Sequence, residues 1–209
     1  MPMTSPGTRI FAASGLALLA ACTTNNQRGD IVITKVVRPT LVESACIVAP
    51  TTDELAFGGI DPNVATSYVM GVVVENRLPF AVQGTNRLNT NDFQVEQARV
   101  SYEVLAGGAL ALEEKVTPAN GLVKAGQSKA AGTVLMPDDI VTLLRGGSRT
   151  VRLKMRLEGR FLDGSSAKTS QYEYAIKACA GCGPAAPVCG VGETAVTCAP
   201  GQDSDVGCK

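Results

Sequence analysis

The residues best able to do chemistry in this chain are its cysteines, which crowd towards the C-terminus. The 209-residue chain has seven cysteines, and five of them lie within residues 178–209. Thiols at such spacings form disulfides, bind zinc or exchange electrons, and the compartment decides among these fates. The six cysteines beyond the N-terminal region are Cys46, Cys179, Cys182, Cys189, Cys198 and Cys208.

The first residues of the chain carry the features of an export signal. A single Arg9 precedes the uncharged, apolar run at residues 10–21, which is the order of the n-region and h-region of a secretory signal. A membrane-crossing helix needs about 20 apolar residues, so this run is too short to be one. We expect no transmembrane helix in the mature protein.

The apolar run ends in Leu19-Ala20-Ala21-Cys22, which resembles the lipobox of bacterial lipoproteins. The resemblance implies that residues 1–21 are a signal peptide and that Cys22, the new N-terminus, carries acyl chains such as palmitate. Two or more acyl chains hold a protein stably on a membrane. Enteric lipoproteins retained at the inner membrane have Asp at the next position, whereas residue 23 is Thr. The resemblance therefore implies the outer membrane, on its periplasmic or its surface face.

An exported chain with six cysteines besides Cys22 is expected to contain three disulfides. Six cysteines can pair in 15 ways, and the sequence selects none of them. Because five cysteines in the tail cannot all pair with one another, Cys46 must bond to a tail cysteine if all six are bridged. We prefer Cys179 as its partner, since this residue follows the last expected strand.

Two other chemistries remain open for the tail. Cys179 and Cys182 have the spacing of a redox pair. Redox pairs need a helix N-terminus to lower a thiol pKa, but a Gly-Pro dipeptide follows these cysteines and no helix is predicted there. Cys179, Cys182, Cys189 and Cys198 also have spacing that suits zinc, although an oxidising compartment favours disulfides. We therefore predict no metal and no cofactor.

The composition excludes several functional classes. The chain has no His, so it has no Ser-His-Asp triad, no Cys-His dyad and no zinc-binding HExxH helix. Lys plus Arg equals Asp plus Glu at 19 each, and there is no Trp, which argues against a nucleic-acid partner. We expect a protein without catalytic residues.

From residue 31 onward the sequence predicts a series of strands. Runs rich in β-branched residues predict strands at residues 31–37, 41–48, 68–74, 93–105, 109–116 and 129–135. Residues 51–66 carry turn signals and predict a loop. The phase of alternation changes within residues 93–105, which predicts a β-bulge near residues 97–99. Pro137, two acids and apolar residues at helical spacing predict one short helix within residues 136–147.

The clearest pattern is a hairpin at residues 150–177. Apolar and charged residues alternate from Val151 onward, and Asp163-Gly164 is a favoured hairpin turn. In the expected register the numbers of paired residues sum to 327. Val151 then faces Ile176, Leu153 faces Tyr174, Met155 faces Tyr172 and Lys154 faces Glu173, so apolar meets apolar and opposite charges meet.

The polar face of this hairpin carries a basic stripe. A stripe of this kind contacts anionic lipid headgroups or an acidic partner, or else it is a solvated strand face with Glu neighbours. We favour the solvated face. The stripe consists of Arg152, Lys154, Arg156 and Arg160.

These features predict an all-β protein, an antiparallel β-sandwich similar to immunoglobulin and fibronectin-III modules, with one short helix and a disulfide-rich C-terminal tail. Its parts are the signal peptide (1–21), the lipidated Cys with a polar tether (22–30), the sandwich (31–177) and the Cys-rich tail (178–209). The tail composition is similar to that of outer-membrane lipoproteins of myxobacterial type.

We expect a non-catalytic envelope lipoprotein, anchored to the membrane by lipid, with a structural or partner-binding role. One alternative is a ligand-binding or accessory lipoprotein of a secretion, motility or transport machine, marked by an open strand edge or an apolar pocket. A further alternative is a thiol-disulfide oxidoreductase that uses Cys179 and Cys182.

Overall fold

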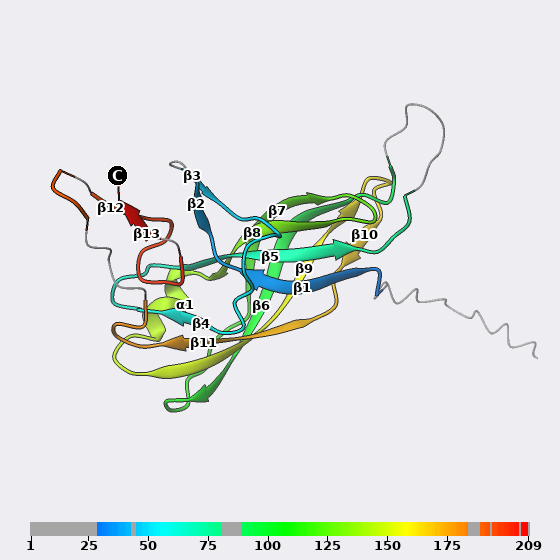
Figure 1. Cartoon of the computed structure of the whole chain (residues 1–209). Helices are drawn as coiled ribbons and strands as arrows, with labels where there is room; N and C mark the ends of the chain where they lie inside the picture. Colours follow the sequence, from blue (N-terminus) through cyan, green and yellow to red (C-terminus); the bar gives the residue numbers. More distant parts are fainter. Residues whose placement is uncertain are drawn as a thin grey trace, which may run out of the picture.

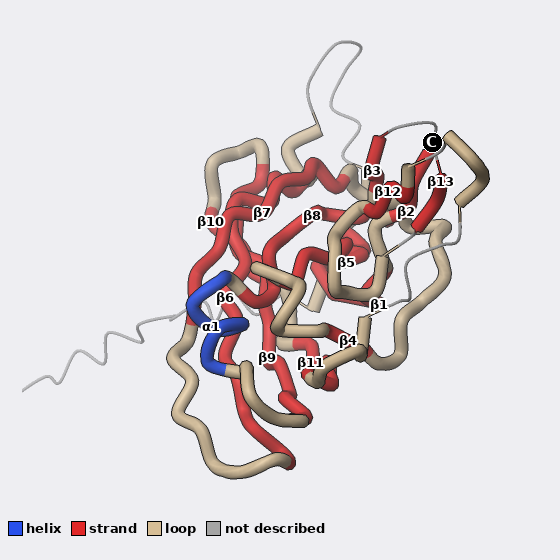
Figure 2. The backbone as a smooth tube through the Cα atoms, turned by 90° about the vertical axis from the view of Figure 1, so that its left-hand side faces the viewer, coloured by secondary structure: helices blue, strands red, loops and turns tan. Residues whose placement is uncertain are grey.

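The computed structural model describes residues 29–42, 45–80, 89–183, 189–192, 194–204 and 206–208. Cys22, the expected signal peptide and most of the expected tether lie outside the described residues. In the described part the chain is mostly strand with one short helix (Figures 1 and 2), which confirms the all-β class. No helix in this part is long and apolar enough to cross a membrane.

Thirteen strands and one helix follow one another along the described part of the chain. In order they are β1 (Ile31–Val37), β2 (Thr40–Val42), β3 (Ala45–Ile47), β4 (Gly58–Ile60), β5 (Tyr68–Asn76), β6 (Phe93–Ala106), β7 (Lys115–Val123), β8 (Ser128–Met136), α1 (Asp138–Leu143), β9 (Arg149–Phe161), β10 (Ser166–Lys168), β11 (Tyr172–Ala178), β12 (Ala195–Thr197) and β13 (Val206–Cys208).

Nine of the described strands form one curled sheet. Its order is β1-β5-β8-β7-β6-β9-β11-β4, and β10 also pairs with β9. β7 joins the two halves, because residues 119–120 pair with β8 while the residues on either side pair with β6. The halves thus stay hydrogen-bonded and curl round a common core, so the expected two-sheet, immunoglobulin-like sandwich is not confirmed (Figure 2).

The core lies inside the curl and is filled from both halves of the sheet. Val72 and Val74 of β5, Val100 of β6 and Leu153 and Met155 of β9 are fully buried in one apolar cluster. Along β9 buried and partly exposed residues alternate without a break from Val151 to Gly159. This is the period of two expected for a strand with one face in the core and one in water.

The predicted hairpin register is confirmed. Met155 pairs with Tyr172, Leu153 with Tyr174 and Val151 with Ile176. The return strand is nevertheless divided, because β10 pairs one residue out of this register before β11 restores it.

The predicted helix is also confirmed, as α1. The strands predicted at residues 31–37, 68–74 and 129–135 are confirmed as β1, β5 and β8, and β5 and β8 are slightly longer than expected. The bulge in β6 lies at Glu96, one residue before the expected place. Two predictions are wrong, since residues 41–48 contribute to a hairpin of β2 and β3, and residues 109–114 precede β7 rather than forming it. β4 lies inside the expected loop.

The described N-terminal and C-terminal parts lie at opposite ends of the molecule. β1 begins at the right of Figure 1, whereas β12 and β13 lie at the left, near β2 and β3. The Cys-rich tail thus meets the body at the end where β4 and β11 lie.

Candidate functional site

The described cysteines form three disulfides, Cys46–Cys198, Cys179–Cys182 and Cys189–Cys208. Cys46 does reach the tail, but the preference for Cys179 as its partner is wrong. Cys179 continues β11 beside β4, where its N–H donates to the Ile60 carbonyl at 3.1 Å. It therefore closes a tight turn with Cys182 instead. The four cysteines considered for zinc are all engaged in disulfides.

Two small hairpins and two disulfides form what we call the tail module: β2, β3, β12 and β13 with Cys46–Cys198 and Cys189–Cys208. The hairpins touch, since a Cβ at Gly207 would lie 3.1 Å from Leu41 Cδ2. Val42 and Ile47 are exposed on one hairpin, and Val191 is exposed just before the other. The module therefore offers apolar side chains to solvent and relies on covalent bonds for its order.

A short tail segment, residues 201–203, closes the free edge of β4. The Asp61 N–H donates to the Gly201 carbonyl at 2.6 Å, and the Asp203 N–H donates to the Gly59 carbonyl at 3.2 Å. Gly201 has φ +75°, and a Cβ there would lie 2.7 Å from the Ala65 nitrogen. Only glycine fits this conformation and this close approach without strain. The tail thus extends the sheet by one short, edge-covering segment.

Gln202 fixes this segment to the start of β5. Its side chain is fully buried. Its Oε1 accepts from the Val69 N–H at 2.7 Å, and its Nε2 donates to the Val69 carbonyl at 2.6 Å. The amide thereby satisfies both backbone groups of one residue, as a neighbouring strand would.

Beside Gln202, a buried cluster joins the tail to both halves of the sheet. The Tyr68 hydroxyl donates to Asp203 Oδ2 at 3.2 Å and lies 3.3 Å from the Tyr174 hydroxyl. The Gly59 N–H also donates to Asp203 Oδ2. We call Tyr68, Tyr174 and Asp203 the tyrosine–aspartate cluster.

The electrostatics of this cluster suit a structural clamp. Burial, followed by the neighbouring Tyr174 and Asp203, raises the pKa of Tyr68 well above its ordinary value. Burial likewise raises the pKa of Tyr174 and that of Asp203. Because both tyrosines keep their protons at neutral pH, they donate hydrogen bonds and do not act as bases.

The Cys179–Cys182 disulfide borders a cavity of about 410 Å³ that Arg145, Asn63 and Ala180 also line. Residues 144–148 of its wall follow the C-terminus of α1, the end of a helix that repels a thiolate. The Gly181 N–H between the cysteines donates to Asp61 Oδ2 at 2.6 Å, which places a carboxylate nearby. The wall thus brings a carboxylate and the Arg145 cation, which act in opposite directions on a thiol pKa, to the disulfide.

The predicted basic stripe lies on the solvent face of β9, among carboxylates of neighbouring strands. Arg152 Nη1 lies 3.7 Å from both Glu103 and Glu173, and Lys154 Nζ lies 3.1 Å from Glu103. Arg160 lies 3.6 Å from Glu96. Hydrogen bonding by Lys154 lowers the pKa of Glu103. None of the ion pairs between described residues involves Arg156, but its positive charge helps to lower the pKa of Glu158. The stripe is thus offset by acids.

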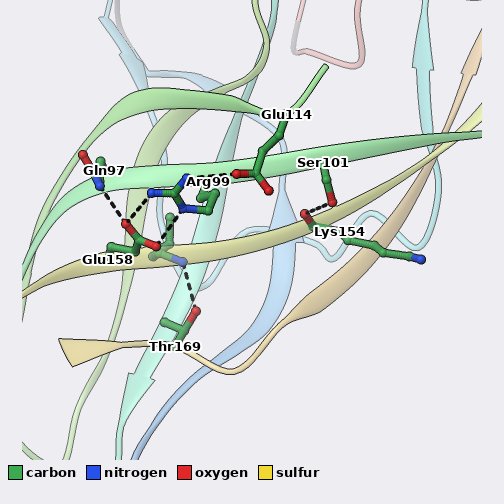
Figure 3. A network of polar contacts seen from close by, with 8 residues as sticks. Gln97, Arg99, Ser101, Glu114, Lys154, Glu158 and Thr169 are labelled. Carbon is green, nitrogen blue, oxygen red and sulfur yellow. Dashed lines mark hydrogen bonds and ion pairs between the residues drawn. The ribbon is translucent and has the colours of Figure 1, made fainter. Parts of the chain in front are cut away.

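A second polar network lies on the same face, around Arg99 (Figure 3). Arg99 Nε donates to Glu158 at 3.0 Å and Nη1 donates to Glu114 at 2.9 Å, while Gln97 donates to Glu158 at 2.7 Å. Arg99 lowers the pKa of Glu158. Beside it a groove of about 480 Å³ runs between the bulge at Glu96 and β10. The groove walls are polar and charged, unlike the apolar pocket of a small-molecule site.

Sequence reasoning located the cysteines and the stripe but missed Gln202, Asp203 and the tyrosine–aspartate cluster. Gln202 and Asp203 stand in a segment without alternation, so no periodic signal marks them as buried. Tyr68 and Tyr174 were recognised as strand residues, and only the fold brings their hydroxyls together.

No family model, no curated protein and no solved structure matches this chain.

Proposed function

We propose that the protein is a non-catalytic lipoprotein of the bacterial cell envelope, anchored at the outer membrane through Cys22, whose tail module binds a partner protein. The observation that carries the proposal is the Leu19-Ala20-Ala21-Cys22 sequence at the end of an export signal. Three disulfides support it, because such bonds persist in oxidising compartments outside the cytoplasm.

The tail module is favoured as the binding surface because it combines rigidity with exposed apolar side chains. Its two disulfides cross-link short hairpins that have little core of their own. Val42, Ile47 and Val191 are held there in solvent. A preorganised surface with apolar centres binds a partner without a large loss of conformational entropy.

Fractionation of a Cys22→Ser variant tests the anchor. The wild-type chain is expected in the outer-membrane fraction, with the mass of an acylated protein that begins at Cys22 and has lost six hydrogens to three disulfides. The variant is expected in the soluble fraction. A matched Thr23→Asp variant, still acylated, is expected at the inner membrane where sorting follows enteric rules. A Cys22→Ser protein that remains wholly with membranes contradicts the proposal.

The accessory-lipoprotein alternative draws on a different observation, the strand β10. Among the described strands β10 pairs with β9 alone, and it borders the groove beside Glu96. A partner strand could add to such an edge. Photo-crosslinkers placed singly at Ile47 and at Ala167, in the full chain on membranes, separate the two surfaces. Crosslinks from Ile47 support the tail module, and crosslinks from Ala167 support strand addition at β10.

A further inference from the structure

The curled sheet presents one end to the lipid anchor that the proposed function requires. β1 begins there at Ile31, and the Arg77 N–H donates to the Asp30 carbonyl at 2.7 Å. The Ser170 N–H contacts the Ile31 carbonyl at 3.4 Å. The chain therefore enters the fold between the segment after β5 and the segment before β11, at the right of Figure 1.

Two exposed apolar side chains stand at this same end. Phe80 is 64% exposed and Leu162 is 40% exposed. Their loops are tied to adjacent residues, since the Asn91 amide donates to the Pro79 carbonyl at 2.9 Å and the Leu162 N–H donates to the Asp92 carbonyl at 3.1 Å. We call Phe80 and Leu162 the end patch.

We infer that the end patch lies in the interfacial region of the bilayer and that the tail module points away from the membrane. This inference rests on the proposed function. The segment between Cys22 and the fold, residues 23–30, has eight residues and reaches about 26 Å at ~3.3 Å each. The surface nearest the anchor is therefore the end where β1 begins, and the tail module lies at the opposite end (Figure 1).

Charge at this end does not drive the contact. Arg77 pairs with Glu75 at 3.0 Å. Lys124 is exposed on the loop beside Asp92, whose carboxylate accepts from the Ala125 N–H at 2.9 Å. Asp163 accepts from Ser165 within its own turn. With Asp30, the acids named at this end outnumber the bases, so insertion relies on apolar burial of the aromatic and aliphatic side chains and not on attraction to anionic lipid.

The absence of Trp from the sequence makes a direct test available. Three full-length, acylated variants, Phe80→Trp, Leu162→Trp and the tail-module control Ile47→Trp, each carry a single Trp. They are reconstituted into vesicles of phosphatidylethanolamine and phosphatidylglycerol, with and without brominated acyl chains. We expect blue-shifted emission and strong bromine quenching for Phe80→Trp and Leu162→Trp, and neither effect for Ile47→Trp.

The outcomes separate this inference from the proposed function. Vesicle flotation reports the anchor, and quenching reports the orientation. Protein that floats with the vesicles while Phe80→Trp and Leu162→Trp are quenched no more than Ile47→Trp overturns the orientation alone. Acylated protein that does not float overturns the proposed function and the orientation together.

Discussion

The curled sheet and the Cys-rich tail are ordered by different physical means. In the sheet, long strands bury an unbroken apolar stripe, and side chains such as Leu153 and Met155 have no contact with water. In the tail, β12 and β13 have three residues each, and the buried side chains among the described residues after β11 include the polar ones of Gln202 and Ser204. Apolar burial orders a segment only where enough apolar residues alternate. Elsewhere covalent and polar contacts must replace it.

The difference teaches where the tail is vulnerable. A buried apolar side chain keeps most of its stabilisation when a neighbour changes, whereas a buried polar group depends on one or two partners. Ser204 shows this dependence, because its hydroxyl bonds Thr197 and the Ala199 carbonyl, each at 2.9 Å. The tail is therefore expected to respond strongly to the loss of single atoms that the sheet would tolerate.

The largest expected effect comes from the disulfides, whose contributions depend on loop length. The sequence separations are 152 for Cys46–Cys198, 19 for Cys189–Cys208 and 3 for Cys179–Cys182. The chain-entropy relation gives about 5, about 3 and about 2 kcal/mol respectively. Replacing each pair by Ser should lower the free energy of urea-induced unfolding in this order.

Hydrogen exchange sharpens the same experiment. With Cys46 and Cys198 both replaced, we expect amides of β12 and β13 to lose protection while those of β9 keep theirs. Equal loss of protection in β9 and β12 would show that the sheet depends on the tail, and the contrast between the two regions would fail.

An effect comparable to that of the disulfides is expected from Gln202→Ala. The change leaves the Val69 N–H and carbonyl without their buried partners, and each such loss costs about 1–3 kcal/mol. The two losses together should lower the free energy of unfolding by about 2–6 kcal/mol. Gln171→Ala, at an exposed position before β11, is the matched control and should change little. Equal effects of the two variants would contradict the role assigned to the Gln202 amide.

The sheet was largely predictable because period-2 alternation reports burial directly. The register of β9 and β11 shows how such a prediction succeeds despite irregularities. The turn leaves a three-residue loop, since the Phe161 N–H donates to the Ser165 carbonyl, so β10 pairs one residue out of register. Between β10 and β11, the Thr169 hydroxyl accepts from the Leu157 N–H at 3.0 Å. One extra residue in this connection restores the register in which paired residue numbers sum to 327. The pairing of apolar and of oppositely charged side chains therefore sets the register of β9 and β11, and the turn does not.

Other elements escaped prediction for physical reasons. β7 contains Pro118 and Gly121, which are rare in strands, so the strand pattern of the sequence ends near Val116. β4 has two glycines among its three residues and owes its place to β11 and the tail. The Cys46–Cys198 disulfide and the tyrosine–aspartate cluster depend on contacts between residues more than a hundred positions apart. No local pattern in the sequence encodes such contacts.

A smaller effect, visible as pH dependence, is expected from Asp203. Burial raises its pKa from the ordinary value of 3.8, so between that value and the folded-state value the folded protein binds more protons than the unfolded chain. The contribution of Asp203 to the free energy of unfolding is therefore fully present below the pKa of the unfolded chain. It is lost as the pH rises from that value through the folded-state pKa. The effect is small, because Asp203 is partly exposed and solvent screens its charge.

Asp203→Asn removes this titration while keeping an oxygen acceptor for the Tyr68 hydroxyl and the Gly59 N–H. Unfolding free energies of both proteins, measured from pH 3 to pH 7, should diverge in favour of the variant as pH rises. Asp163→Asn, in an exposed turn, controls for the loss of a carboxylate. A difference that stays constant with pH would contradict the assigned burial effect.

The smallest effect is expected on the basic stripe, where solvent screens every charge. Lys154→Met breaks the 3.1 Å pair with Glu103 at the surface of β9. Because exposed ion pairs contribute little and salt weakens them further, we expect a slight loss of stability in low salt that vanishes in high salt. Vesicle binding through Cys22 should be unchanged in a variant with Arg152, Lys154, Arg156 and Arg160 all replaced by Gln. A contrary result would be that this variant, compared with wild type, attaches less well to anionic vesicles while its attachment to neutral vesicles is unchanged. The stripe would then be a lipid contact, and the face of β9, not the end patch, would lie against the membrane.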